Sequence, residues 1–333
     1  MKVAVVILNW NGKQLLEQFL PSVVQFSQEA TVYVADNAST DDSVAFVNTH
    51  FPEVSIVVNP TNTGYAGGYN EALQHIDADV YALVNSDIEV TENWLQPIIK
   101  TFQNDPTTAI IQPKILDFKN KKYFEYAGAA GGYIDQYGYP FCRGRLFDTL
   151  EKDNGQYDTN QEIFWASGAC FFIRSKVYNE LNGFDTSFFA HQEEIDLCWR
   201  AKNKGYTIKY LFESKVYHVG GATLQQGNPK KTELNFRNSL LMLTKNLPKK
   251  DLFRVLFIRM VLDGIAGLKF LLEGQPKHLV AVLKAHIEFY KLFSKNYNKR
   301  SNFQLGEYYY TKNIVFKYFM MKLRFFYEIS SNK

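Results

Sequence analysis

The chain has 333 residues, of which 46% are hydrophobic, so it can bury a full core in one large domain or two. Its net charge is +3, but residues 1–228 hold 17 basic against 27 acidic side chains, whereas residues 229–333 hold 20 against 7. This asymmetry predicts an acidic front region and a basic, aromatic-rich back region with different tasks. The three cysteines are widely spaced and the first residues lack a signal-peptide cleavage site, which argues against a disulfide-stapled secreted domain and favours a cytoplasmic protein.

The first hundred residues alternate apolar runs with helical patterns. The expected strands cover residues 2–10, 31–37, 54–60 and 79–87, and the expected helices cover residues 13–26, 39–51, 66–76 and 91–103. Strands that alternate with helices over short links predict a mostly parallel sheet covered by helices. In such a sheet, right-handed crossovers bring the carboxyl ends of the strands to one edge, which is where ligands bind.

The regular alternation of expected strands and helices ends in the middle of the chain. Two apolar runs there have strand patterns, and a Gly- and Tyr-rich stretch between them indicates hairpins or a loop. The two runs cover residues 109–116 and 162–174, and the stretch between them covers residues 125–145. From Glu233 onward the pattern is almost entirely helical, with breaks at Pro248 and Pro276. We therefore expect an α/β domain over residues 1–230 and a helical, basic and aromatic-rich region over residues 231–333.

The basic back region is a candidate for contact with a membrane. The helical pattern at residues 251–273 carries too many charges for a transmembrane span, and its apolar residues share one face. They are Phe253, Phe257, Met260, Val261, Leu268 and Leu271. We expect this segment to be an amphipathic helix packed on the domain. Residues 308–330 instead interleave Lys and Arg with aromatic residues, which favours peripheral contact with an anionic membrane surface on the cytoplasmic side.

Polar residues and glycines follow the front strands at the points where each strand is expected to end. They are Asn9 and Asn11 after the first strand, Asp36 after the second, Asn62, Gly64, Gly67 and Asn70 after the third, and Asn85, Ser86 and Asp87 after the fourth. Each group alone is ordinary turn chemistry. Together, at one edge of a parallel sheet, they indicate a ligand site.

The residue types at this edge fit a nucleotide diphosphate. Asp36 offers acceptors to a base or a ribose, the glycines let a backbone approach a ligand closely, and helix N-termini favour phosphates. Asp87 is a hard oxygen ligand for Mg²⁺ or Mn²⁺, and such a metal usually also binds substrate phosphates. Other motifs fit less well. NWNGKQ stands where a dinucleotide-binding fold has G-x-G-x-x-G, no Walker P-loop motif occurs, and WASGAC lacks the nucleophile-elbow pattern.

Seven segments, in order between residues 3 and 246, resemble those of the family 2 glycosyltransferases, which have the GT-A fold, and within them the bacterial rhamnosyltransferase-like group. The segments are VVILNWNG, VADNASTDDS, NTGYAGGYNEAL, LVNSDIEV, ASGACFFIR, NGFDTSFFAHQEEIDLCWR and VYHVGGAT. The resemblance implies a Rossmann-like α/β domain with a mostly parallel central sheet, followed by the helical region. It also implies inverting transfer of a sugar from a nucleotide diphosphate to an acceptor hydroxyl.

The resemblance implies roles for the strand-end residues. Asp36 would contact the nucleoside, and residues 62–70 would line the nucleotide. Asn85-Ser86-Asp87 stands where the family has its D-x-D-like motif, so Asp87 would be the main metal ligand. His218 matches a histidine that completes the metal site in some members, although a surface-loop histidine is the alternative. Mg²⁺ or Mn²⁺ is the implied cofactor.

The catalytic base of the family falls in the segment Glu193-Glu194-Ile195-Asp196, where it would take the proton of the acceptor hydroxyl. The matching position is Glu194, where the family usually has Asp. Because Glu is longer by one methylene, Glu193 is the alternative base. The two glutamates also suit the first turn of a helix, and Asp196 is spaced to pair with Arg200.

The resulting hypothesis is a metal-dependent, inverting hexosyltransferase. It would move rhamnose or another hexose from a dTDP- or UDP-sugar to a glycan or polyprenyl-diphosphate-linked acceptor in cell-surface polysaccharide synthesis. Trp165, whose alternative is a core position, and His191 would contact the acceptor or the sugar. The hypothesis allows a homo-oligomer and expects no nucleic-acid partner. Two alternatives stay open: a sugar nucleotidyltransferase, and a non-catalytic glycan- or nucleotide-binding protein on the same fold.

Overall fold

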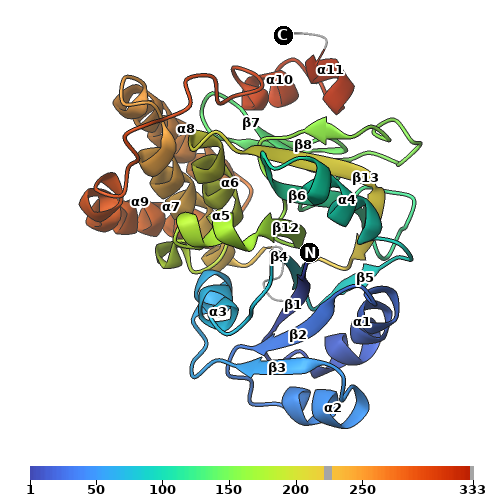
Figure 1. Ribbon diagram of the computed structural model, residues 1–333. Helices are drawn as coiled ribbons and strands as arrows, with labels where there is room; N and C mark the ends of the chain where they lie inside the picture. The colour runs from blue at the N-terminus through green and yellow to red at the C-terminus, as the bar shows by residue number, and fades with distance from the viewer. Residues whose placement is uncertain (221–226, 331–333) are drawn as a thin grey trace.

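The apolar run near the start of the chain forms a strand in the middle of a large sheet. The computed structural model describes residues 1–220 and 227–330, and it orders this sheet β11-β13-β6-β12-β4-β1-β2-β3, with β5 beside β13 (Figure 1). The strands are β1 (Val3–Asn9), β2 (Thr31–Asp36), β3 (Ser55–Val58), β4 (Val80–Asn85), β5 (Ile88–Val90), β6 (Thr108–Asp117), β11 (Gln161–Glu162), β12 (Cys170–Arg174) and β13 (Thr207–His218). The first four strands are parallel to their neighbours among themselves, which confirms the parallel sheet expected for the front of the chain.

Alternate residues of β1 face two different layers of helices. Val5 and Ile7 pack with apolar residues of α1, α2 and α4, whereas Ala4 and Val6 pack with those of α3, α5 and α6. These helices are α1 (Lys13–Phe26), α2 (Ser43–His50), α3 (Gly64–Leu73), α4 (Gln96–Asn104), α5 (Ser175–Glu180) and α6 (Glu193–Asn203), and a short 3-10 helix, η1 (Thr186–Phe188), precedes α6. A strand covered on both faces is apolar throughout, which is why its sequence is a continuous apolar run.

Two expected elements differ from the structure. α4 begins later than expected, at Gln96, and Pro97 takes its first turn, where a missing N–H breaks no helical hydrogen bond. The strand expected over residues 162–174 is divided into β11 and β12. Between them the backbone pairs with the second, smaller sheet, because Trp165 N and Gly132 O, as well as Gly132 N and Trp165 O, are hydrogen-bonded at 3.2 and 3.1 Å.

The Gly- and Tyr-rich stretch forms this smaller antiparallel sheet, as the sequence indicates. Its strands are β7 (Gly132–Ile134), β8 (Pro140–Cys142), β9 (Arg145–Leu146) and β10 (Thr149–Leu150). The C-terminal segment packs against it. Tyr310 N donates to Ile134 O at 2.9 Å, and Phe326 N donates to Glu151 Oε1 at 3.1 Å, while Ile314 is fully buried. Part of the aromatic-rich segment 308–330 therefore belongs to the core.

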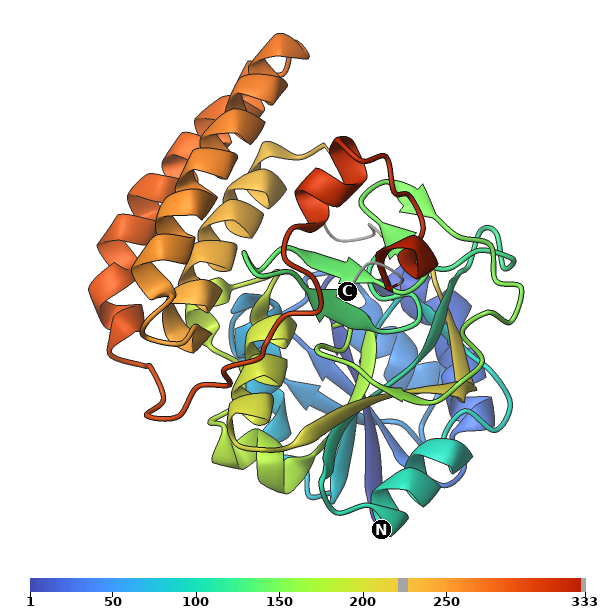
Figure 2. The same cartoon turned by 90° about the horizontal axis from the view of Figure 1, so that it is seen from above.

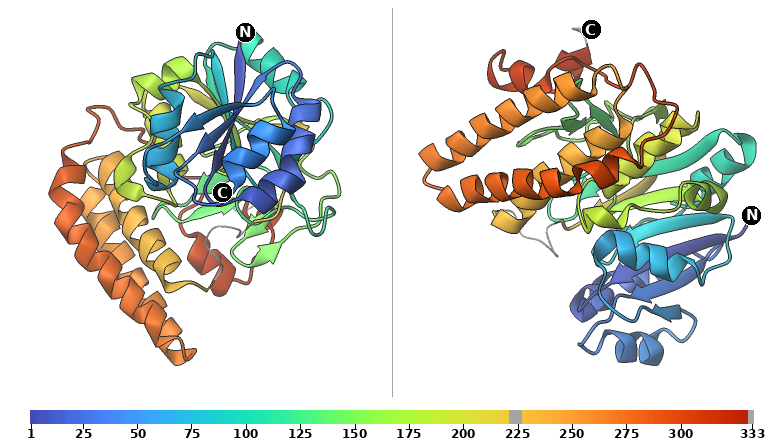
Figure 3. Two further views of the ribbon diagram at one scale, coloured as in Figure 1. Left: turned by 90° about the horizontal axis from the view of Figure 1, so that it is seen from below. Right: turned by 90° about the vertical axis from the view of Figure 1, so that its left-hand side faces the viewer.

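The C-terminal part is helical and breaks at the two expected prolines. Its helices are α7 (Pro229–Asn246), α8 (Leu252–Leu272), α9 (Pro276–Tyr297), α10 (Ile314–Phe319) and α11 (Phe326–Ser330). Pro248 follows the end of α7, and Pro276 begins α9. α8 and α9 form an antiparallel pair beside α7, and this pair projects from the rest of the molecule (Figures 2 and 3). Within residues 1–220 and 227–330, no helix combines the length and the apolar content needed to cross a bilayer.

α8 packs on the domain, as expected, but with charged residues in the contact. Arg259 is buried, donates to Tyr137 O at 2.8 Å and lies 3.6 Å from Asp263 Oδ1. Asp263 in turn lies 3.2 Å from His286 Nε2 on α9. The apolar face that the sequence identifies is exposed instead: the side chain of Phe257, for example, is 69% exposed. The helix is therefore amphipathic, with its apolar face turned to solvent.

Candidate active site

The carboxyl ends of the front strands meet at one edge of the sheet, as the sequence predicts. In the sheet register, Asn9 at the end of β1 lies opposite Asp36 at the end of β2, and Asn85 at the end of β4 lies opposite Leu8. Val58, the last residue of β3, also lies opposite Asp36. The residues that follow these four strands therefore share one edge, where α/β sheets bind ligands.

Asp36 is buried at this edge and is held by two donors. Its Oδ1 accepts a hydrogen bond from Asn9 Nδ2 at 3.1 Å, and its Oδ2 accepts one from Ser39 N at 2.9 Å. Asn11 Oδ1 accepts from Thr40 N at 2.7 Å, which closes the neighbouring loop. A cavity of about 640 Å³ adjoins this loop, lined by Asn11, Gly12, Lys13, Gln14, Leu15, Asp41 and Asp42. Fixed acceptors beside a cavity are what the binding of a polar ligand requires.

The N-terminus of α3 is closed by a carbonyl group from another segment. Tyr65 N and Ala66 N donate to Phe189 O at 3.0 and 3.4 Å. Gly64 is needed at this contact because it has φ +74° and a Cβ there would lie 2.6 Å from the same oxygen. The helix N-terminus that was expected to bind a phosphate thus binds a carbonyl group of the protein instead.

The other nucleotide candidates near α3 also have partners within the protein. Asn62 Oδ1 accepts from Asn37 Nδ2 and from Gly64 N, both at 2.9 Å. Asn70 Nδ2 donates to Phe184 O at 2.8 Å, and Asn70 Oδ1 accepts from Phe184 N at 2.9 Å. A Cβ at Gly67 would lie 2.5 Å from the side chain of Thr63, four residues earlier in the chain. These contacts fix the shape of the loop and tie α3 to the segment before α6.

His218 lies against Asp87, as a shared metal site requires. Asp87 is in the turn after β4, and His218 ends β13. His218 Nε2 is 3.2 Å from Asp87 Oδ1, and its Nδ1 is 3.2 Å from Glu125 Oε1; all three side chains are buried. Burial disfavours the charged imidazole, but the carboxylates of Glu125 and Asp87 outweigh it and raise the pKa of His218 to about 10. Burial likewise opposes the charge of Asp87, yet His218 lowers its pKa below the usual range.

This donor set fits a divalent ion that shares its coordination with a substrate. Mg²⁺ usually takes one or two protein ligands and completes its shell with water and phosphate oxygens, and Mn²⁺ accepts the same donors. Asp87 and His218 Nε2 are sufficient for that purpose, although residues 1–220 and 227–330 contain no closed cage of three or more acidic, His or Cys side chains. Glu125 Oε1 lies near the other ring nitrogen without forming a hydrogen bond to it, so Glu125 would act on the imidazole through its charge. The segment VYHVGGAT continues past His218 into residues 221–223, which lie outside the described residues.

Glu125 is a candidate that the sequence does not reveal. It precedes the small sheet, in a stretch whose glycines and tyrosines indicate only hairpins. Its Oε2 accepts from Ala127 N at 2.6 Å, so the carboxylate is anchored by its own turn and its other oxygen is directed at His218. A carboxylate behind a histidine ligand is a recurrent second partner in metal sites, but only the folded chain brings the two together.

The two glutamates lie in the first turn of α6, as expected, together with Asp196, and the helix dipole favours negative charge there. Asp196 is fully buried and has structural partners. Its carboxylate accepts from Arg200 Nε, Lys245 Nζ and Asn246 Nδ2, each at 2.8 Å. The pairing with Arg200 expected from their spacing is confirmed, and it leaves the two glutamates as the acids available for chemistry.

The two glutamates differ in accessibility. Glu193 is 4% exposed, and its Oε2 has no hydrogen-bond partner in the described part of the chain. Burial, followed by the charge of Glu194, raises the pKa of Glu193 well above its usual range. Glu194 is partly exposed, and burial raises its pKa to about 7 against the opposing effect of the backbone amides at the helix start. Burial therefore favours the protonated form of Glu193, whereas the pKa of Glu194 lies near neutral pH.

A short backbone segment connects Glu194 to the strand edge. A Cβ at Gly168 would lie 3.7 Å from Glu194 Cγ, and the carbonyl of Gly168 accepts from Tyr65 OH at 2.7 Å. The next carbonyl, that of Ala169, accepts from Asn85 N at 2.9 Å. Ser86 follows Asn85, and a Cβ at Gly12 in the first strand-end loop would lie 3.7 Å from Ser86 Oγ. Glu194 and the Asn85-Ser86-Asp87 turn thus border the same edge.

The segment before α6 is strained and is held by α7. Phe189, His191 and Gln192 have φ values of 63°, 71° and 74°, which non-glycine residues rarely adopt. Asn238 Nδ2 donates to three carbonyl oxygens of this segment at 2.8 to 3.0 Å. The Nε2 of His191 is buried without a partner in the part of the chain described, and burial, with a smaller effect of Lys231, lowers the pKa of His191 to about 4. The ring is therefore neutral at physiological pH.

Trp165 lies in the core, which is one of the two positions considered for it. Its side chain is 2% exposed, and its indole N–H donates to Tyr133 O at 2.9 Å. A Cβ at Gly132 would come within 2.1 Å of the ring. The buried ring leaves no exposed face on which a sugar could stack.

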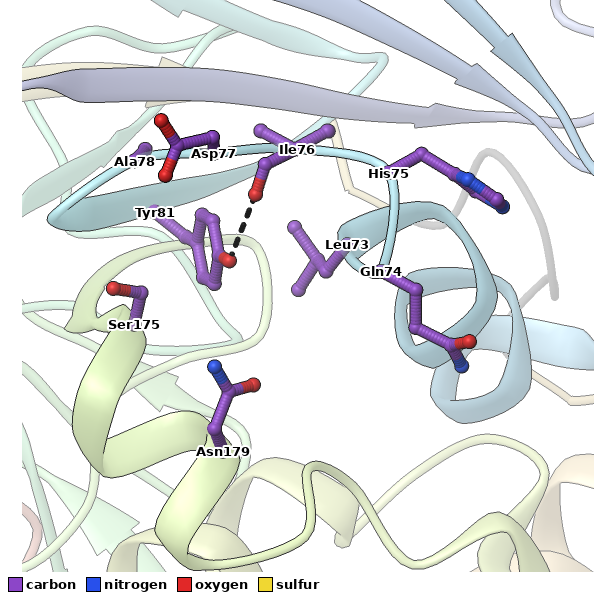
Figure 4. A pocket seen from close by; sticks show the side chains of 9 residues that line it. All are labelled: Leu73, Gln74, His75, Ile76, Asp77, Ala78, Tyr81, Ser175 and Asn179. Carbon is purple, nitrogen blue, oxygen red and sulfur yellow. Dashed lines mark hydrogen bonds between the residues drawn. The ribbon is translucent and has the colours of Figure 1, made fainter.

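A second cavity, of about 450 Å³, lies at the amino end of β4, away from the carboxyl ends of the strands. Its lining residues come from the end of α3, the start of β4 and α5, and are Leu73, Gln74, His75, Ile76, Asp77, Ala78, Tyr81, Ser175 and Asn179. Across it, Tyr81 OH donates to Ile76 O at 3.1 Å (Figure 4). Because the amino end of β4 borders this cavity, it is separate from the candidate site at the carboxyl ends of the strands.

Sequence comparison links the chain to enzymes that transfer sugars. Residues 4–182 match the family model described as glycosyl transferase family 2. The N-acetylglucosaminyl-diphospho-decaprenol L-rhamnosyltransferase of Mycobacterium tuberculosis is 22% identical over 229 residues, which cover 64% of this chain and 75% of that protein. The low-salt glycan biosynthesis hexosyltransferase Agl10 of Haloferax volcanii is 21% identical over 210 residues, which cover 62% of this chain and 63% of that protein.

Structural comparison leads to the same fold. GalNAc-T7, solved with UDP, GalNAc and Mn²⁺, superposes with a TM-score of 0.61 at 16% identity, covering 99% of this chain and 57% of that chain. Residues 1–349 of S. aureus TarS superpose with a TM-score of 0.56 at 14% identity, covering 94% of this chain and 100% of that chain. These likenesses confirm the expected GT-A fold.

Proposed function

Because the chain belongs to glycosyl transferase family 2, we propose that it transfers rhamnose or another hexose from a dTDP- or UDP-sugar to a hydroxyl of a glycan or polyprenyl-diphosphate-linked acceptor, with inversion at the anomeric carbon. The observation that carries the proposal is that Asp87 and His218 meet at the strand edge that Glu194 also borders. The similar rhamnosyltransferase and glycan hexosyltransferase support a role in cell-surface polysaccharide synthesis.

The strand edge supplies the donor site. Asp36, fixed by Asn9 and Ser39, would accept hydrogen bonds from the nucleoside. Asp87 and His218 Nε2 would hold Mg²⁺ or Mn²⁺, with Glu125 behind the imidazole. When bound, this ion would stabilise the negative charge of the diphosphate leaving group. Mn²⁺ in the structures of GalNAc-T7 and of the Pyrobaculum calidifontis mannosyltransferase supports such a cofactor.

Glu194 is the base in this proposal. Inverting transfer needs one carboxylate that takes the proton of the acceptor hydroxyl as its oxygen attacks the anomeric carbon. Glu194 is partly exposed, and its pKa of about 7 allows it to gain and lose a proton near neutral pH. Glu193 is buried, and burial favours its protonated form, which cannot accept the proton. In this proposal, Glu193 stays protonated beside Glu194 and does not act as the base.

The reaction is tested with a panel of donors. The protein is incubated with Mn²⁺ and dTDP-rhamnose, UDP-glucose or UDP-GlcNAc, with and without a polyprenyl-diphosphate-linked sugar, and the released nucleotide is identified by chromatography. We expect release of dTDP or UDP that increases when the acceptor is added. Formation of dTTP or UTP and sugar 1-phosphate when pyrophosphate is added, without release of dTDP or UDP, would instead indicate a nucleotidyltransferase. Tight nucleotide binding without turnover of any donor would indicate the non-catalytic alternative.

A matched pair of variants tests the base. Glu194→Gln should reduce the transfer rate about 10²- to 10⁴-fold, the usual contribution of a general base. Glu193→Gln resembles the protonated form that burial favours and should stay within about tenfold of the wild type in the same assay. Thermal unfolding of both variants controls for folding. Equal losses in the two variants, or full activity of Glu194→Gln, would contradict the assignment.

A lipid-linked acceptor implies a reaction at the inner face of the cell membrane. The similar rhamnosyltransferase is named for a decaprenol-linked acceptor, which supports this acceptor class. The basic C-terminal region, with 20 basic against 7 acidic side chains in residues 229–333, is suited to an anionic membrane surface. We therefore propose peripheral membrane association.

A further inference from the structure

The outer side of the α8–α9 pair, here called the hairpin face, is a row of exposed apolar side chains. Its members are Phe253, Phe257, Val261, Ile265, Leu268, Leu271 and Leu272 on α8, and Val280, Leu283, Ile287 and Tyr290 on α9, and each is 46% to 80% exposed. Their spacing of mostly three and four residues puts each set on one side of its helix. Apolar patches of this extent on soluble proteins usually mark an interaction surface.

The inner contacts fix which side of the hairpin faces outward. Arg259 and Asp263 of α8 are buried, and Asp263 contacts His286 of α9 at 3.2 Å. The Tyr290 hydroxyl lies 3.1 Å from Met260 Sδ, so the apolar rows of the two helices are adjacent at this point. Because buried charges that lose their partners are costly, the hairpin cannot rotate to hide its apolar face without breaking this network.

Basic residues flank the hairpin face. Lys277, Lys284 and Lys291 are exposed and spaced by seven residues, or two helical turns, so they form one row along α9 beside Val280 and Ile287. Lys277 and Lys284 have no ion pair in residues 1–220 and 227–330, and their positive charge is therefore available to a partner. An apolar stripe bordered by lysines is the pattern of a helix that lies in the interface of an anionic bilayer.

We propose that the hairpin face docks on an anionic lipid bilayer, with its apolar side chains at the boundary between headgroups and acyl chains and with the lysines of α9 at lipid phosphates. The inference rests on the proposed function only in that a lipid-linked acceptor requires a membrane. It moves the contact from residues 308–330 to the hairpin, because much of that tail is packed in the core. A second copy of the chain is disfavoured as the occupant, since residues 229–333 carry 20 basic against 7 acidic side chains and would repel their counterpart.

α7 connects this face to the candidate active site. At its start, Thr232 Oγ1 lies 2.8 Å from His278 Nδ1 on α9, and further along it Asn238 holds the strained segment before α6. Docking on the hairpin face would therefore set the base-bearing end of α6 at a fixed position relative to the bilayer. This is the geometry that an enzyme acting on a lipid-linked acceptor needs.

Vesicle sedimentation tests the proposal with the full chain. The wild type should sediment with phosphatidylcholine vesicles containing 30% phosphatidylglycerol, and far less with pure phosphatidylcholine. The double variant Phe257→Glu/Ile265→Glu should reduce partitioning at least about tenfold. The pair Lys277→Gln/Lys284→Gln should reduce it about thirtyfold on anionic vesicles only. The matched control Phe316→Glu/Met320→Glu, at exposed apolar positions of the tail, should bind as the wild type does.

The outcomes separate this proposal from its rivals. Failure of the wild type to sediment, or unchanged binding of the hairpin variant, would overturn it. A loss confined to the tail variant would return the contact to residues 308–330. If sedimentation velocity shows a dimer that the hairpin variant dissociates while vesicle binding persists, the face is an interface between two copies. Donor turnover without vesicles is measured in parallel, and it should be equal in the wild type and the hairpin variant. Vesicle binding without turnover would refute the proposed function alone.

Discussion

Lys245→Met should strongly destabilise the protein, because one buried ammonium serves two buried carboxylates. Lys245 is 4% exposed, and its Nζ lies 2.8 Å from Asp185 Oδ2 and 2.8 Å from Asp196 Oδ2. Removing one partner of a buried ion pair costs about 3–5 kcal/mol, since the charge left behind is uncompensated. Asp196 keeps Arg200 and Asp185 keeps Lys299, so we expect a loss at the lower end, about 3 kcal/mol.

Urea unfolding followed by tryptophan fluorescence measures this loss. For a slope of about 3 kcal/mol per M, the midpoint should fall by about 1 M. The control is Lys299→Met, whose side chain contacts Asp185 but is 33% exposed and should contribute about 1 kcal/mol or less. A midpoint for Lys245→Met within about 0.3 M of the wild type, or an equal loss in the control, would refute the reasoning.

The loss should also depend on pH. Burial opposes the charges of Asp185 and Asp196, but Lys245 outweighs it and keeps both pKa values below the usual range. A carboxylate with a lowered pKa stabilises the folded state above its unfolded pKa of about 4, and this contribution is lost as the pH falls through the folded value. The difference between Lys245→Met and the wild type should therefore be largest near pH 7 and shrink as the pH falls below 4. A constant difference over that range would contradict the electrostatic origin of the effect.

Three further predictions concern the site. The transfer rate should fall as the pH drops below about 7, because Glu194 then gains a proton; a flat profile from pH 5 to 8 would contradict its role as base. Glu125→Gln should weaken Mn²⁺ binding, measured by calorimetry, about 10- to 100-fold. Glu151→Gln, at a buried carboxylate away from His218, is the control, and unchanged affinity of Glu125→Gln would exclude Glu125 from the metal site. Asn238→Leu removes the side-chain donor of the Ala190 and His191 carbonyls, whereas the Phe188 carbonyl keeps Arg237 Nη2 and Ala190 N. The variant should lose about 1–3 kcal/mol in urea unfolding and transfer sugar more slowly. Normal stability and rate would show that the segment before α6 needs no support from Asn238.

The sequence predicts the front of the fold and its ligand edge well, for a physical reason. A parallel strand that is covered on both faces is apolar throughout, so β1 and β4 are visible as continuous runs. The topology then brings the carboxyl ends of the parallel strands to one edge of the sheet. The polar residues that follow the strands, such as Asp36 and Asp87, can therefore be placed at that edge without knowledge of side-chain contacts. The prediction therefore depends on local pattern and on general rules of chain handedness.

The parts that could not be predicted depend on contacts between distant segments. Glu125 and His218 are adjacent because β6 pairs with β13 and the chain after β6 folds back, so that Glu125 N bonds to Ile115 O. Nothing in the stretch around Glu125 signals that role. The side of α8 that packs inward contains Arg259 and Asp263, whereas an apolar pattern alone indicates the opposite side. Trp165 could be assigned to the core only once Gly132 was seen beside it.

The packing of the tail on the small sheet has a consequence for how the chain folds. Ile314 N donates to Asp135 Oδ2 at 3.0 Å, and Phe326 N donates to Glu151 Oε1, in contacts that span 179 and 175 residues of sequence. Contacts of such high sequence separation close late and slow folding, because the entropy of a long loop is lost before they form. During synthesis, the small sheet stays uncovered until residues 314–326 leave the ribosome. We therefore expect the nascent chain to depend on chaperones over this interval, well after the parallel half of the large sheet has formed.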